Sequence, residues 1–167
     1  MIGNVVTGGY GTTQHALSWL VWYLLNQPAE LAKVRADATH MEAARKELLR
    51  MEPPVEGIFR TAETDLHAGG CPFQKGDTFM ISLMSANRDP ALYNDPDSFK
   101  LDRDNRRLLS YGAGPHRCLG AALANAIIEE AVMVLLQRAP DLELVDTIDG
   151  WSPADGFREK DKLIVRI

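Results

Sequence analysis

One cysteine in this chain has neighbours that suggest metal or thiolate chemistry. Cys118 follows Gly112 and Gly114, precedes Gly120, and stands just before an apolar stretch. Glycine allows positive φ and lets the main chain come close to a flat ligand. A cysteine at the start of a helix is favoured as the thiolate, the form that ligates metals. The competing interpretation is that Cys118 is a small buried core residue.

Residues 111–120 read YGAGPHRCLG and resemble the signature F-x-x-G-x-H-x-C-x-G of the cytochromes P450, with Tyr111 in place of phenylalanine. The resemblance implies that Cys118 ligates the iron of haem b (iron protoporphyrin IX), where a thiolate makes the iron electron-rich. It also implies that His116 binds a haem propionate. We expect the Tyr111 hydroxyl near the sulfur, where a hydrogen bond would alter the potential of the iron. The residues implied to border the haem are Tyr111, Gly112 and Gly120.

A second motif involves opposite charges. Glu47 and Arg50 have the E-x-x-R spacing, which places both side chains on one face of a helix. Any such pair is by default a surface ion pair worth about 0–1 kcal/mol. The family resemblance instead implies a buried cluster, with Arg103 as its third member, that fixes the loop carrying the cysteine. Its role would be in folding, since removal of one partner leaves a buried charge at a cost of roughly 3–5 kcal/mol.

Residues 8–13, GGYGTT, resemble the distal-helix pattern small-Gly-x-acid-Thr of the same family, with Gly11 where the family has the acid. The resemblance implies that Thr12 hydrogen-bonds dioxygen or water at the haem, while Gly11 removes the carboxylate that usually relays protons. We expect protons to arrive through water beside Gly11, or the chemistry to need no such relay. The competing interpretation is that Gly8, Gly9 and Gly11 only permit close backbone approach.

The segment after the E-x-x-R motif supplies further predicted contacts. Arg60 matches the family position that binds a haem propionate, for which a guanidinium is well suited. The alternative is an exposed strand residue. By the same resemblance, residues 55–59 would line the distal pocket and help to select the substrate, including Val55 and Ile58.

The elements that must position these residues can be predicted from periodicity and turn residues. Residues 16–25 form a helix that is apolar nearly all round, so we expect it to leave apolar surface exposed if nothing else covers it. Residues 7–13 are poor helix formers, because each interior glycine costs about 1 kcal/mol. Further helices are predicted from Pro28 towards Asp37, from about Met41 to before Pro53 and from about Leu119 to Gln137, with short strands within 55–83 and at 163–167 and an irregular loop at 87–107.

The predicted fold class is therefore mainly α with small β-sheets, and by resemblance the C-terminal part of the cytochrome P450 fold. The chain has 167 residues, of which 46% are hydrophobic and 25% charged, which indicates one globular domain over residues 1–167. A net charge of −5 offers no basic face for nucleic acid. The apolar run 16–25 is shorter than the about 20 residues that span a membrane. Two cysteines indicate a reducing compartment, and we expect the cytoplasm.

The resemblance runs in family order from residue 8 to residue 167, whereas members of the family are much longer. We expect that the amino-terminal half, which covers the haem edge and much of the pocket, is absent from this sequence. One function that follows is a haem-thiolate monooxygenase, as a fragment or truncated form, that uses two electrons and O2 to oxidise a small organic substrate. The alternative is a haem-binding or vestigial module without catalysis that needs a partner chain.

The expected partners follow from the same resemblance. They are a small-molecule substrate, an electron donor of the ferredoxin or flavodoxin type, and the missing amino-terminal half. The donor would approach the cysteine side of the haem, where Arg106, Arg107 and Arg117 offer positive charge. The alternative for these three arginines is that they are ordinary solvated residues.

Overall fold

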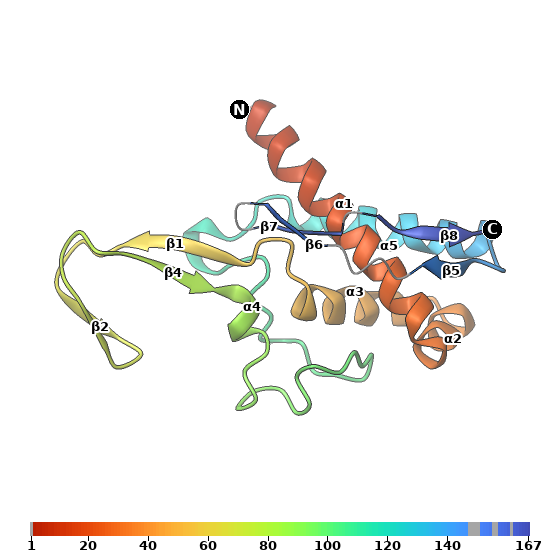
Figure 1. Cartoon of the computed structure of the whole chain (residues 1–167), viewed down its shortest axis with the longest axis horizontal. Helices are drawn as coiled ribbons and strands as arrows, with labels where there is room; N and C mark the ends of the chain where they lie inside the picture. The colour runs from red at the N-terminus through yellow and green to blue at the C-terminus, as the bar shows by residue number, and fades with distance from the viewer. Residues whose placement is uncertain (1, 147–150, 155–156, 161) are drawn as a thin grey trace.

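The computed structural model describes residues 2–146, 151–154, 157–160 and 162–167 (Figure 1). The chain is mainly helical with small two-stranded sheets, which confirms the predicted fold class. The helices are α1 (Ile2–Asn26), α2 (Pro28–Ala36), α3 (His40–Met51), α4 (Leu83–Ala86) and α5 (Ala121–Arg138), with a 3-10 turn η1 at Gly114–His116. Proline sets two of these limits, since Pro28 is the first residue of α2 and Pro53 follows the end of α3.

The strands form separate antiparallel pairs. The pairs are β1 (Gly57–Thr61) with β4 (Thr78–Ser82), β2 (Leu66–Ala68) with β3 (Cys71–Phe73), β5 (Glu143–Asp146) with β8 (Ile164–Arg166), and β6 (Trp151–Ala154) with β7 (Phe157–Lys160). In Figure 1, β1 and β4 extend away from the helices, and β2 lies at the far end of this extension. Residues 87–107 contain turns without helix or strand, as the sequence predicts.

Helix α1 is continuous through the glycine-rich residues 7–13. Its second half packs against α3 and α5, where Leu20 and Leu24 are fully buried (Figure 1). Tertiary packing of this kind usually contributes more to helix stability than propensity does. The glycines therefore weaken the first half of α1 without interrupting it.

Other elements cover the apolar residues 16–25, so the condition under which they would be exposed is not met. Ala16, Leu20 and Leu24 are buried, because the core formed by α1, α3 and α5 encloses this part of the helix. Exposed apolar side chains lie elsewhere, at Val6, Tyr10, Phe59, Met80, Leu119 and Leu123. None of the helices among the described residues is both long enough and apolar enough to cross a membrane.

Candidate functional site

The loop around Cys118 is held by its own main chain. The N–H of Gly112 donates to the carbonyl of Leu109 at 2.7 Å, and the N–H of Cys118 donates to the carbonyl of Tyr111 at 2.8 Å. Gly112 and Gly114 have φ of 67° and 70°, a region that side chains with a Cβ rarely adopt. A Cβ at Gly112 would meet its nearest neighbour at 3.9 Å, so the backbone angle rather than crowding requires glycine there.

This loop presents the side chain of Cys118 to solvent. The competing interpretation of Cys118 as a core residue is therefore wrong. Helix α5 begins at Ala121 with Gly120 as its N-cap, so Cys118 stands just before the helix. A Cβ at Gly120 would lie 4.0 Å from the Cys118 sulfur, and glycine leaves that side of the sulfur open. An accessible thiol on a backbone-fixed loop near the positive end of a helix fits a thiolate ligand for haem iron.

The hydroxyl of Tyr111 is bound to helix α5. It donates to Oδ1 of Asn125 at 2.6 Å. The Tyr111 ring is half-buried against the helical core. The proton of the hydroxyl is thus engaged by Asn125, and the expected proximity of the hydroxyl to the sulfur stays a prediction.

Glu47, Arg50 and Arg103 form one cluster of hydrogen bonds and ion pairs. The Arg50 guanidinium donates to both carboxylate oxygens of Glu47 at 2.9 Å, and Nε of Arg103 donates to Oε1 of Glu47 at 2.9 Å. Glu47 and Arg50 are fully buried, so the alternative of a surface ion pair is wrong. Asn105 and the main-chain N–H of Lys100 complete the set of donors around the carboxylate.

The protonation of Glu47 follows from these contacts. Burial alone would raise the pKa of this carboxyl, because it disfavours the charged form. Hydrogen bonds from Arg50, Asn105 and Arg103 outweigh that effect and hold the pKa of Glu47 below its usual range. Glu47 is therefore ionised, and several hydrogen-bond donors bind its carboxylate.

The two arginines also fix the loop that follows α4. Arg50 donates to the carbonyls of Asn87 and Pro96, at 3.1 and 2.7 Å. Arg103 donates to the carbonyl of Asn94 at 2.6 Å. Arginine offers enough N–H donors to bind a carboxylate and carbonyls at once. The cluster thus determines the path of residues 87–105.

No pattern in the sequence points to Asn87. It is fully buried, accepts from the N–H of Leu109 at 3.0 Å and donates to the Ser110 hydroxyl at 2.8 Å. Ser110 in turn donates to the carbonyl of Leu49 on α3. Asn87 therefore joins the E-x-x-R helix to the residues immediately before the cysteine loop. An asparagine in a loop without periodicity carries no signal of such a role.

Thr12 and Gly11 lie in the first half of α1. The Thr12 hydroxyl donates to the carbonyl of Gly8 at 2.7 Å, one turn earlier. Its proton is therefore engaged, whereas its oxygen can still accept a hydrogen bond. A Cβ at Gly11 would lie 3.8 Å from Cε1 of His15, an ordinary contact, so a larger side chain can begin there.

Among the described residues, the side chains of Arg60 and His116 make no hydrogen bond to each other. Arg60 is exposed on β1 and donates to the carbonyl of Phe59 at 2.8 Å. His116 is exposed in η1. Val55 and Ile58 are half-buried at the start of the β1 region.

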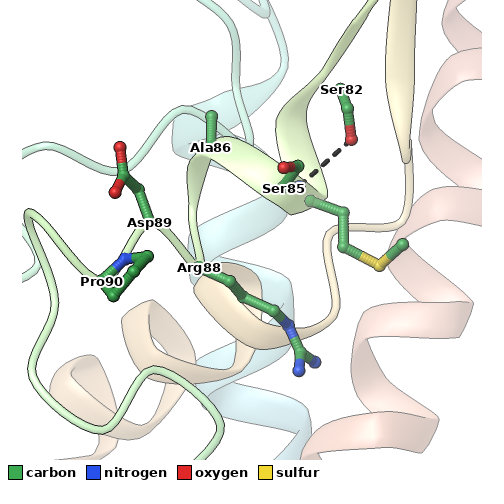
Figure 2. A pocket seen from close by; sticks show the side chains of 7 residues that line it. Ser82, Ser85, Ala86, Arg88, Asp89 and Pro90 are labelled. Carbon is green, nitrogen blue, oxygen red and sulfur yellow. Dashed lines mark hydrogen bonds between the residues drawn. The ribbon is translucent and has the colours of Figure 1, made fainter.

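The structure also has a surface hollow of about 600 Å³ (Figure 2). In it the Ser85 N–H donates to Oγ of Ser82 at 3.1 Å, which caps α4. Its lining comes from residues 82–90 and includes none of the predicted site residues. Arg88 at its edge is bound to Glu52 and Asp97. The hollow is therefore not the candidate site.

Comparison with known proteins identifies relatives over most of the chain. The family model described as cytochrome P450 matches residues 1–139. The chain is 36% identical over 157 residues to the biotin biosynthesis cytochrome P450 of Bacillus subtilis (strain 168), covering 94% of this chain and 40% of that protein. It is 36% identical over 166 residues to the cytochrome P450 monooxygenase PikC of Streptomyces venezuelae, covering 97% and 40%. The chain thus spans about 40% of the length of these curated relatives.

Solved structures agree with the sequence relatives. The ligand-free P450 monooxygenase TamI superposes with a TM-score of 0.95 at 33% identity, over 99% of this chain and 41% of that chain. P450BioI, solved with an acyl carrier protein ligated to hexadec-9Z-enoic acid, superposes with a TM-score of 0.91 at 36% identity, over 96% and 41%. Sequence and backbone agree over nearly all of the chain, and it belongs to the cytochrome P450 family.

Proposed function

We propose that this chain forms the haem-binding part of a monooxygenase that oxidises a small organic substrate, with Cys118 as the iron ligand. The observation that carries the proposal is the exposed thiol of Cys118 on a loop fixed by its main chain. When bound, haem b with a thiolate ligand supplies the activation of O2 with two electrons. His116 and Arg60 would bind its propionates.

On the distal side, Thr12 is proposed to hold water by accepting a hydrogen bond. Its own proton is given to the Gly8 carbonyl, so the hydroxyl is oriented with its lone pairs available. Gly11 supplies no carboxylate, and protons would reach Thr12 through water beside it. Val55 and Ile58 would contact the substrate.

An electron donor of the ferredoxin or flavodoxin type would approach the cysteine side. Of the three arginines there, Arg106 is bound to Asp104 at 2.7 Å, which offsets its charge. Arg107 and Arg117 are exposed. We therefore assign the attraction of an acidic donor to Arg107 and Arg117.

A second candidate function is a haem-binding module without monooxygenation, which needs a partner chain. Gly11 favours it, because the usual proton-relaying acid is absent. The two candidates share haem ligation and differ in whether substrate is oxidised. Product formation by the haem-loaded protein supplied with electrons and O2 separates them.

The test of ligation is the carbon monoxide difference spectrum of the reduced protein. The wild-type protein should show the shifted band of a thiolate ligand, and Cys118→Ala should abolish it while helix content is retained. Cys71→Ala is the matched control, because Cys71 is the other exposed cysteine and lies in β3. A thiolate band that survives Cys118→Ala would refute the proposal.

A further inference from the structure

Tyr111 and Asn125 contact each other in the structure. Tyr111 replaces the phenylalanine of the cysteine signature, and its hydroxyl lies 2.6 Å from Oδ1 of Asn125 on α5. The amide oxygen of an asparagine can accept this hydrogen bond. Asn125 therefore supplies an acceptor for the hydroxyl that tyrosine adds to the signature.

The contact bears directly on the iron ligand. The carbonyl of Tyr111 accepts the N–H of Cys118 at 2.8 Å. Tyr111 is thus tied to Cys118 through its main chain and to α5 through its side chain. A shift of the Tyr111 ring would move the backbone partner of Cys118 with it.

The Tyr111 phenol is half-buried against the helical core. A half-buried phenol then needs an acceptor, since an unmade hydrogen bond in such a place is costly.

We propose that Asn125 is a positioning residue for the cysteine loop, which accepts the Tyr111 hydrogen bond and holds that hydroxyl against α5. The proposal rests on the proposed function in that Cys118 is taken as the iron ligand. Because its hydroxyl is bound to Asn125, Tyr111 adds no hydrogen-bond donor to the Cys118 thiolate. Donors to a ligating sulfur withdraw electron density and raise the reduction potential.

A double-mutant cycle on the haem-loaded protein tests the proposal. Asn125→Leu removes the acceptor, so the released hydroxyl turns to the sulfur and the ferric–ferrous equilibrium shifts roughly tenfold towards ferrous, about 59 mV for one electron. In the Tyr111→Phe background, Asn125→Leu should leave the potential unchanged, because no hydroxyl remains. An equal shift in both backgrounds, or no shift with Tyr111 present, would overturn the proposal.

A second measurement is independent of haem. The exchange of the Cys118 amide should be roughly tenfold faster in Asn125→Leu than in wild type, since the loop loses its tie to α5. Asn125→Asp keeps an acceptor oxygen and should restore slow exchange. Equal exchange rates of the Cys118 amide in Asn125→Leu and Asn125→Asp would contradict the proposal that the hydrogen bond to Asn125 holds the loop. Absence of a thiolate band in the wild-type protein would instead refute the proposed function, while this exchange comparison would still decide the role of Asn125.

Discussion

At the scale of single residues, the carboxylate of Glu47 has the largest expected effect on stability. Glu47→Gln leaves Arg50 and Arg103 as buried charges without an anion, so we expect a loss of roughly 3–5 kcal/mol in the free energy of unfolding. Urea denaturation measures this loss. The control is Glu42→Gln, which breaks an exposed pair with Lys46 and should cost about 0–1 kcal/mol. Equal losses in the two variants would contradict a special role for the buried cluster.

The same residue predicts a dependence on pH. Because the folded-state pKa of Glu47 is lowered, its contribution to stability is present above the unfolded-state pKa and is lost as pH falls through the folded-state value. The difference in unfolding free energy between wild type and Glu47→Gln should therefore shrink as pH is lowered from 7 into the acid range. A difference that stays constant with pH would show that the charge of Glu47 is not its source.

A substitution at Gly11 tests whether the proposed distal site lacks a proton-relaying acid. A Cβ there makes only an ordinary contact with His15, so Gly11→Glu can be accommodated. We expect the new carboxylate to relay protons and to increase the product formed per electron pair, as a general acid typically does. Gly11→Gln is the isosteric control without the acid, and Gly11→Ala controls for helix propensity. If Gly11→Gln raises the product yield as much as Gly11→Glu does, proton relay is not the cause of the increase.

At the scale of elements, the connection between α3 and the cysteine loop depends on Asn87. Asn87→Ala removes the buried acceptor of the Leu109 N–H and the donor to Ser110, so we expect a loss of roughly 1–3 kcal/mol and faster release of haem. Asn26→Ala, which removes an exposed hydrogen bond at the end of α1, is the control. Denaturation and haem transfer to apomyoglobin measure the two effects. A haem release rate equal to wild type would show that Asn87 does not position the loop.

The helices and motifs with local signals could be predicted from the sequence. The 3.6-residue period and the prolines predicted α2, α3 and α5, and the spacing of Glu47 and Arg50 reflects one helical turn. The roles of Asn87 and Asn105 could not be predicted, because their hydrogen-bond partners lie 22 to 58 residues away in the chain and a loop has no periodic pattern. The direction of the Tyr111 hydroxyl also depends on a helix that packs beside it in three dimensions. Resemblance rather than pattern suggested Arg103.

The exposed apolar surface follows from packing alone. Residues 16–25 would be exposed only if nothing packed on them, and the core covers them. Exposure falls instead on strand positions such as Phe59, in a two-stranded sheet where Phe59, Arg60 and Thr61 are exposed in succession. The burial of a strand face is set by what packs on the sheet, which no short window of sequence contains.

At the scale of the whole molecule, the β1–β4 pair predicts association. Phe59 and Met80 are cross-strand partners and are 68% and 52% exposed, which places an apolar pair on an open sheet face. We expect concentration-dependent self-association, or binding of another chain, that Phe59→Ser with Met80→Ser reduces. Sedimentation velocity measures it, with Val145→Ser on β5 as an exposed apolar control. If the double variant and the wild type sediment equally, the apolar face of the β1–β4 pair is not the site of association.

Helix α1 runs without interruption from the buried core to Thr12. Leu20 is held in the core, whereas Thr12 lies about 12 Å further along the axis at about 1.5 Å per residue. A tilt of about 10° at Leu20 would displace Thr12 by about 2 Å over that length. The position of the Thr12 hydroxyl therefore depends on how the core holds the second half of α1. A core substitution that tilts α1 moves Thr12 without contacting it.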